Sequence, residues 1–445
     1  MSYYASIITA LVGFVILIAT YKRVREKGKI SIIDYFMFFF LLQFGPHAWF
    51  PHYLKWHVDK VDINSLNMCN YGIALSYLCL SFSFVIGEKI IKINNTGYSD
   101  LPIKRFPRII AITVVYIFAF IIASTRTNNS LFSMTYTYLA YLKGTSFFDY
   151  TEIRRLLYSD KNILTTMLNG TRYSLTPVLF SLIIGISFTF YRSKKIILSF
   201  LVFLFSLPLF VLLALQLNKL VYIYYFLLII LTVFHNKIDK VDLTHLKVDV
   251  NLIVGVVKTG LVLSALLFLL VFMQYRNLHD GFRMISYAAS LIVYRIFISG
   301  GDELALWFDA YPDLFPFTGI NNISKLATLL GTQVQDPTVD IPRLYLGDVL
   351  TTLQTGFIGS GYASFGYPGI VICSLIVGIV LMTLTKLTSR FNSPVLRASF
   401  VATMGLSTYF LTSSQLHTCL LSSGGLIVTP FFFVGLHFIL RFRGR

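Results

Sequence analysis

Residues 196–235 read IILSFLVFLFSLPLFVLLALQLNKLVYIYYFLLIILTVFH, a stretch that is apolar except for LQLNK at positions 215–219. A helix rises about 1.5 Å per residue and the hydrocarbon core of a bilayer is about 30 Å thick, so one span needs about 20 apolar residues. The stretch is too long for one span. We therefore predict a helical hairpin, with Lys219 at its outer turn and Pro208 kinking the first arm.

Comparable apolar runs recur along the chain. Of the 445 residues, 56% are hydrophobic and only 13% are charged, whereas a soluble domain carries about 25% charged residues. We predict an all-α fold, a polytopic transmembrane helical bundle of about 11 spans (roughly 10–12) that forms a single integral membrane domain over residues 1–445. The predicted spans lie near 4–20, 31–46, 66–87, 108–124, 172–191, 196–214, 220–235, 252–273, 358–385, 398–415 and 423–440.

Positive charge sets the predicted orientation of these spans. The net charge of +17 is spread over short Lys/Arg-rich connectors, such as residues 21–30, and such connectors face the cytoplasm. The N-terminus is then periplasmic and the C-terminus cytoplasmic. Because the cluster at 22–29 follows the first apolar run, that run is predicted to be an uncleaved span and not a signal peptide. Nucleic acid is not a predicted partner, since the basic residues form no patch on a soluble fold.

Two long polar segments, residues 125–172 and 274–357, fall on the opposite, periplasmic side. Each contains a shorter apolar run that we predict to be an interfacial or re-entrant helix, at 131–142 and at 284–300. In the second run, Arg283 and Arg295 are twelve residues apart, and an arginine near the centre of a bilayer costs about 2.5–3.5 kcal/mol. These segments are the predicted working surface.

Basic residues on that face suit a substrate with a phosphate head and a lipid tail, because guanidinium groups bind phosphate oxygens in a bidentate fork. The alternative is that each such side chain only extends to the lipid headgroups. The candidate pyrophosphate-binding residues are Arg126, Arg172, Lys219, Arg276, Arg283 and Arg295.

Acids and histidines on the same face can serve as the general base of a glycosyl transfer. Asp302 and Glu303 follow the predicted interfacial helix and Asp348 precedes a late span, so these three are the candidate catalytic residues. His279 and His417 are further base candidates. The alternative for each acid of the second segment, Asp336 and Asp340 included, is a solvated surface position.

Several kinds of chemistry are not indicated. The chain contains no P-loop, HExxH, GxSxG or Rossmann glycine pattern, and its four cysteines show neither a disulfide framework nor zinc-ligand spacing. No cofactor or metal is predicted. Few charged residues, Asp34 and Lys258 among them, fall inside predicted spans, which disfavours an ion-coupled transporter.

Two stretches carry a resemblance to a known family. Residues 319–330 read GINNISKLATLL, and residues 351–372 read TTLQTGFIGSGYASFGYPGIVI, with Gly361, Gly366 and Gly369 at the entry to a span. This is similar to the C-terminal signature of the O-antigen polymerases (the Wzy-type oligosaccharide repeat-unit polymerases). The hairpin LQLNKLVYIYYFLLIIL at 215–231 resembles that family's short polar turn, although many members have glycine or arginine where this chain has Lys219.

The resemblance implies a glycosyltransferase of the bacterial cell inner membrane that acts in lipopolysaccharide or related polysaccharide biosynthesis. It would polymerise undecaprenyl-pyrophosphate-linked oligosaccharide repeat units at the periplasmic face. Its partners would be these lipid-linked oligosaccharides, membrane lipids and a chain-length-regulating membrane protein. Three alternatives remain open: an O-antigen ligase, a flippase or other transporter of lipid-linked oligosaccharide, and a membrane-scaffold subunit, which the charged outer loops disfavour.

Overall fold

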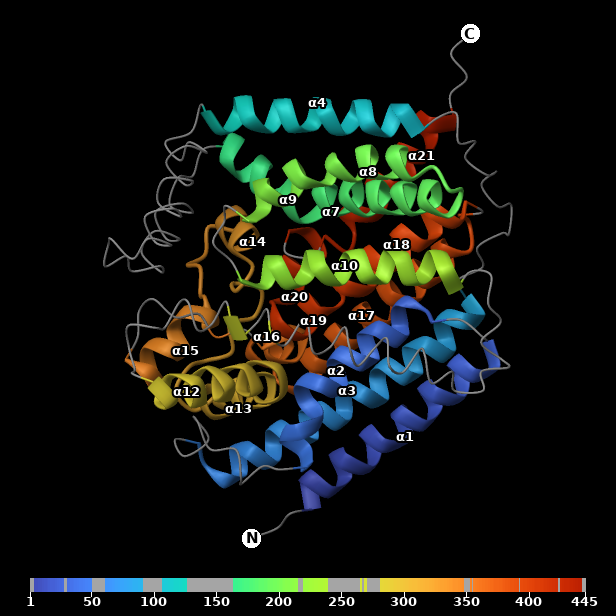
Figure 1. The fold of residues 1–445 in the computed structure, drawn as a ribbon. Coiled ribbons are helices and arrows are strands. Elements are labelled where there is room, and N and C mark those ends of the chain that lie inside the picture. Colours follow the sequence, from blue (N-terminus) through green and yellow to red (C-terminus); the bar gives the residue numbers. More distant parts are fainter. Residues whose placement is uncertain are drawn as a thin grey trace. The chain divides into compact units, whose positions relative to one another are not determined.

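The computed structural model describes most of the chain. The described residues are 4–27, 30–49, 61–90, 106–125, 163–214, 219–238, 265, 268–269, 281–347, 353, 355–391, 393–422 and 425–441. Within these ranges the chain forms helices and no β-strand (Figure 1). The all-α prediction is confirmed for this part of the protein.

Four of the described helices are long and apolar enough to cross a membrane. These stretches are Tyr4–Arg25 in α1 (Tyr4–Lys27), Ile63–Ile90, which is α3, Tyr173–Arg192 in α7 (Ile163–Arg192), and Tyr367–Thr388, which is α17. Shorter apolar helices coincide with further predicted spans: Ile32–Gly45, Phe106–Ile122, Ile196–Val211, Ile223–Asn236 and Val428–Ile439. The predicted span 252–273 lies almost wholly outside the described residues. A count of eleven spans stays a prediction.

The chain divides into two compact units, each assembled from distant segments. Unit 1 comprises Met1–Ile93, Asp242–Lys386 and Ser407–Cys419, and unit 2 comprises Asn94–Val241, Leu387–Leu406 and Leu420–Arg445. The division rests on contacts between residues, so a single integral membrane domain over residues 1–445 stays a prediction.

Unit 2 is organised around α7, which packs against α4 (Phe106–Thr125), α8 (Ile196–Leu204), α10 (Lys219–Ile238) and α21 (Val428–Arg441). Small hydroxyl residues allow close approach of apolar helices. Ser399 and Thr403 of α18 (Pro394–Ser407) donate hydrogen bonds to the carbonyl and hydroxyl oxygens of Ser181, both at 3.0 Å. The contacts of α7 thus include buried hydrogen bonds from side chains to its backbone and to a side chain.

The predicted hairpin lies in unit 2. Its first arm is divided into α8 and α9 (Ser206–Ala214), and its second arm is α10, which contacts α9. Because a proline ring clashes with the carbonyl four residues earlier, Pro208 accounts for the end of α8 at Leu204. The predicted kink is therefore present, a few residues before the proline.

Unit 1 contains α1, α2 (Ile32–Trp49) and α3, and α1 packs against both of the other helices. Asp34, an acid predicted inside a span, lies in the first turn of α2 and forms an ion pair with Arg23 of α1. It also accepts hydrogen bonds from the backbone and hydroxyl of Ser31, at 2.7 and 2.6 Å. These partners offset the cost of burying its charge.

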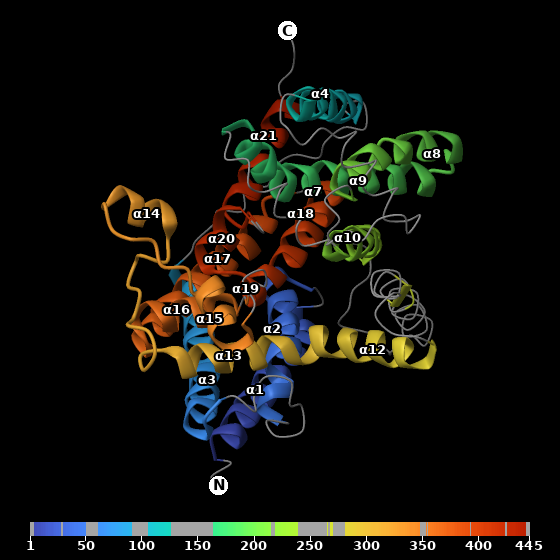
Figure 2. The same ribbon diagram turned by 90° about the vertical axis from the view of Figure 1, so that its left-hand side faces the viewer.

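A long helical rod lies across α2 and α3 (Figure 2). It consists of α12 (Gly281–Val293), the π-helix η4 (Tyr294–Ile298) and α13 (Ser299–Ala310). The sequence predicted a helix over 284–300, and the structure has one that continues to Ala310. It is not among the four helices able to cross a membrane. Its position at a membrane interface stays a prediction.

A sharp corner separates α16 (Gly356–Phe365) from α17. Gly366 has φ +65° and ψ −145°, a conformation that favours glycine. A Cβ at Gly369 would lie 2.0 Å from the carbonyl oxygen of Gly361, so the two helices touch through their backbones. The prediction of one continuous span over 358–385 is therefore wrong at its start, because the spanning helix begins at Tyr367.

Candidate functional site

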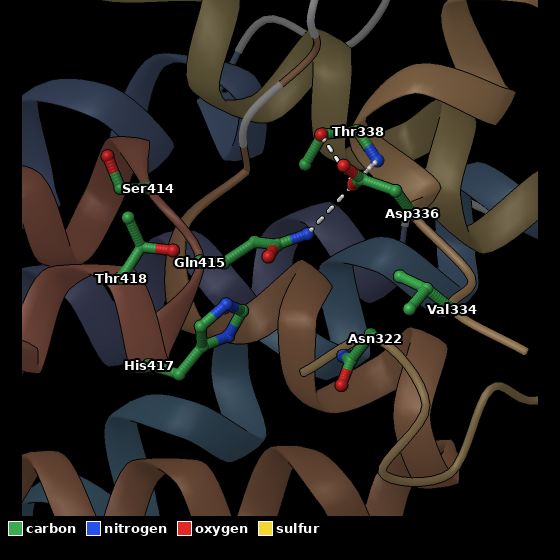
Figure 3. A pocket seen from close by; sticks show the side chains of 8 residues that line it. All are labelled: Asn322, Val334, Asp336, Thr338, Ser414, Gln415, His417 and Thr418. Carbon is green, nitrogen blue, oxygen red and sulfur yellow. Dashed lines mark hydrogen bonds between the residues drawn. The ribbon is translucent and has the colours of Figure 1, made fainter. Parts of the chain in front are cut away.

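A polar pocket of about 210 Å³ lies in unit 1 (Figure 3). It is formed by the segment 322–338 and by the segment 414–418. The two segments are far apart in the chain. Residues 322–338 belong to the predicted periplasmic segment 274–357, whereas Ser414 and Gln415 lie at the outer end of the predicted span 398–415 and His417 and Thr418 follow it. The lining residues are Asn322, Val334, Asp336, Thr338, Ser414, Gln415, His417 and Thr418.

Asp336 is the fixed carboxylate of the pocket. It caps the N-terminus of α15 (Pro337–Leu346), where it accepts hydrogen bonds from the backbone N–H and the hydroxyl of Thr338 at 3.1 and 2.6 Å. The positive end of the helix dipole favours a negative charge there. Gln415 donates a further, longer hydrogen bond of 3.4 Å from its amide to the same carboxylate. Asp336 therefore links the two segments that form the pocket.

His417 is the titratable base of the pocket. It follows the first residue of α20 (Leu416–Leu421), whose backbone N–H lies 3.4 Å from the Ser360 hydroxyl of α16. Burial lowers the pKa of His417, and the negative charge of Asp336 partly opposes that shift. The imidazole is therefore neutral at neutral pH. A neutral imidazole near a carboxylate can accept a proton from a hydroxyl group.

The other lining groups are hydroxyls and amides that both donate and accept hydrogen bonds. The amide of Asn322 donates to the Ser364 hydroxyl at 2.8 Å, and this bond fixes one wall of the pocket to α16. Ligand pockets for drug-sized molecules measure about 300–1,000 Å³. A smaller, polar pocket suits one ring of a polyol such as a sugar.

A second acid lies one helical turn beyond Asp336. Burial and the charge of Asp336 raise the pKa of Asp340, whereas Arg343 acts in the opposite direction. Within the described ranges, no group of three histidine, cysteine or acidic residues lies close enough to hold a metal ion.

Two of the three predicted catalytic residues lie elsewhere in unit 1. Asp302 and Glu303 belong to α13, where Asp302 is fully buried and Glu303 nearly so. The hydroxyl of Tyr294, in η4, donates to Asp302 at 2.9 Å. A catalytic role for these two acids stays a prediction, and Asp348 lies outside the described residues.

The predicted pyrophosphate-binding residues are only partly described. Arg283 is exposed on α12. Lys219 begins α10, Arg172 lies in α7 and Arg295 lies in η4, and for these three the backbone is described but not the side chain. The remaining two, Arg126 and Arg276, lie outside the described residues, as does His279. None of these six predicted pyrophosphate-binding residues is among the described residues that line the pocket.

Sequence reasoning named His417 as a base and Asp336 as one of several outer acids, but it did not pair them. One signal was available, because an aspartate directly before a proline is typical of a helix N-cap. Gln415 and Asn322 carried no signal, since their role depends on which distant segments meet.

Comparisons with protein-family models, curated proteins and solved structures found no match to this chain.

Proposed function

We propose that the protein polymerises undecaprenyl-pyrophosphate-linked oligosaccharide repeat units at the periplasmic face of a bacterial inner membrane. In this proposal the chain crosses the membrane about eleven times with its N-terminus outside. One observation carries the proposal: part of the predicted periplasmic segment 274–357 meets the outer end of the predicted span 398–415 and the residues after it in a pocket that holds a carboxylate, a neutral imidazole, amides and hydroxyls.

The proposed step is a glycosyl transfer. A hydroxyl of the acceptor repeat attacks the anomeric carbon of the donor glycan, and the bond from that carbon to the pyrophosphate oxygen breaks. His417 accepts the hydroxyl proton, and Asp336 stabilises the imidazolium that forms. The electron pair of the broken bond leaves with undecaprenyl pyrophosphate, whose charge the predicted arginines neutralise.

The polar groups of the pocket have a second part in this proposal. Asn322, Gln415 and Thr338 offer donors and acceptors at fixed positions, because each is held by a hydrogen bond to a neighbour. Such groups orient one sugar ring so that a single hydroxyl faces the base. This orientation would set the linkage made.

The test uses a bacterial strain whose copy of this gene is deleted and then restored as a variant. A polymerase deletion leaves lipid A core with a single repeat unit and no ladder on a lipopolysaccharide gel. A ligase deletion leaves bare core with lipid-linked polymer accumulating, and a flippase deletion traps lipid-linked repeats on the cytoplasmic side.

The site itself is tested by His417→Gln and Asp336→Asn, which remove the base and the charge while keeping similar size. The matched control is His245→Gln, in a connector predicted on the cytoplasmic side. Both pocket variants should lose the ladder at normal protein level, and the control should keep it. A full ladder from His417→Gln would contradict the proposed role of the pocket.

A further inference from the structure

A closed loop with an apolar outer part projects from unit 1 (Figure 2). We call residues 319–335 the arm; it contains the short helix α14 (Ser324–Leu329). The backbone N–H of Gln335 donates to the carbonyl of Asn321 at 3.1 Å, and the hydroxyl of Thr332 donates to the Asn321 side chain at 2.7 Å. These bonds close the arm at its base, so its outer part is held in a defined position.

The outer part of the arm exposes an unusual number of large apolar side chains. Leu329 is 80% exposed, Leu330 55% and Leu326 39%. Ile320 and Val334 near the base are also exposed, and the only charged residue in the arm is Lys325. A cluster of leucines on a loop of this kind indicates an apolar partner, because soluble surfaces seldom gather so many.

The base of the arm lies where a candidate membrane span begins. The backbone N–H groups of Thr318 and Gly319 donate to the carbonyls of Ala363 and Ser364, at 2.8 and 3.0 Å. Ala363 and Ser364 lie in the last turn of α16, just before the corner at Gly366 and the start of α17 at Tyr367. The base of the arm is thus fastened next to the start of α17, which is a candidate membrane span.

The apolar surface continues from the arm to that span. A Cβ at Gly319 would lie 4.0 Å from the ring of Phe365, and Phe365 is half exposed. Beyond the corner, α17 exposes Ile372, Ile376 and Ile379, which recur at helical spacing along one face. Because α17 is long and apolar enough to cross a bilayer, this exposed face suits contact with lipid chains.

We propose that the tip of the arm, Leu326, Leu329 and Leu330, is inserted into the hydrocarbon of the leaflet at which α17 begins. The arm is then a fixed anchor at the membrane surface. Since Asn322 and Val334 of the arm also line the polar pocket, the insertion holds that pocket at the level of the lipid headgroups. The proposal does not depend on the chemistry of the pocket.

The experiment measures the depth of the tip with a spin label. Leu329→Cys is labelled in a background in which Cys69, Cys79, Cys373 and Cys419 are replaced by alanine, and the protein is reconstituted into phosphatidylethanolamine–phosphatidylglycerol vesicles. The matched control is Gln333→Cys, an exposed polar position in the same arm. At position 329 the label should collide more often with oxygen, which concentrates in hydrocarbon, than with a water-soluble nickel complex. At position 333 the label should collide more often with the nickel complex than with oxygen.

Two results would overturn the proposal. Equal access of the nickel complex to positions 329 and 333 would place the tip in water, and protection of position 329 from both reagents would mean that protein covers it. If the cysteine-free protein does not fold, the spin-label experiment is replaced by a fluorescence measurement on Leu329→Trp in the protein with its native cysteines. Lipids brominated on their acyl chains should then quench more of its fluorescence than that of the unchanged protein, and equal quenching would contradict insertion.

Discussion

The backbone contact between Gly361 and Gly369 makes a sharp prediction for Gly369→Ala. The added methyl carbon would lie 2.0 Å from the carbonyl oxygen and 2.8 Å from the carbonyl carbon of Gly361. Carbon and carbonyl oxygen approach normally to about 3.3–3.6 Å, so α17 must move away from α16 by roughly 1.3 Å or more. No side chain can rotate to relieve the clash, because both atoms belong to the backbone.

The cost should lie toward the upper part of the range for overpacking, which is about 1–3 kcal/mol. A loss of about 2–3 kcal/mol raises the unfolded fraction roughly 30- to 150-fold. Gly361→Ala should behave similarly, since its Cβ would lie 2.6 Å from the carbonyl oxygen of Gly369. The double variant should cost less than the sum of the two, because one displacement of the helices relieves both clashes.

The assay is thermal unfolding of the purified protein in a mild detergent, with the variants compared at one detergent concentration. Gly435→Ala is the matched control, because it lies inside α21 and no atom lies within 4 Å of its added methyl group. Alanine is the better helix former by about 0.8–1.0 kcal/mol, so the control should unfold at or above the wild-type temperature. An unchanged unfolding temperature for Gly369→Ala would refute the close contact.

The remaining predictions concern the pocket. Replacing Asp336 by Ala removes the N-cap of α15 and should lower the free energy of unfolding by about 0.5–2 kcal/mol, whereas Gln333→Ala, at a neighbouring exposed position, should leave it unchanged in the same thermal assay. The proposed transferase activity should fall as the pH drops below the lowered pKa of His417, because the protonated imidazole cannot accept a proton. Asp336→Asn removes the negative charge that raises this pKa, so the loss of any residual activity in acid should occur at a lower pH than in the wild type. If the pH of this loss does not change, His417 is not the group that titrates. The pKa of Asp340 is raised in the folded state, so its ionisation destabilises the fold above that pKa, and this destabilisation is lost as the pH falls through the raised pKa. Asp340→Asn should therefore be more stable than the wild type at neutral pH, and the two should be equally stable in acid. Thermal unfolding measured across the pH range tests this.

Much of the helical organisation was predictable because hydrophobic length alone sets it. The hairpin of α8, α9 and α10 follows from a stretch of forty residues, 196–235, that is apolar apart from one short polar turn, and Pro208 acts close to its own position through its ring. The corner at Gly366 was predicted only in part: the glycines were noted at the entry to a span, but the span itself was drawn as one run over 358–385, which is mostly apolar on both sides of the corner. Hydropathy cannot distinguish a continuous helix from two helices that meet at a glycine with positive φ.

The candidate site was less accessible to sequence reasoning. Asp302 and Glu303 attracted attention as neighbouring acids after an apolar run, yet Asp302 is fully buried and bonded to Tyr294. Asp336 and His417 are eighty-one positions apart in the sequence, and only the folding of two segments onto α16 brings them to one pocket. Pairings of that kind depend on long-range packing, which a single sequence does not encode in any local pattern.

The division of the chain into interleaved segments has a consequence for synthesis. The last segment of unit 1 in the sequence ends at Cys419. The last segment of unit 2 is Leu420–Arg445, which contains α21, the helix that packs against α7. During translation, α7 is therefore made more than two hundred residues before α21, and until then the face of α7 that packs against α21 stays uncovered. A chain that ends just before α21 would still contain every segment of unit 1, but would leave that face of α7 open to lipid, to chaperones or to a protease.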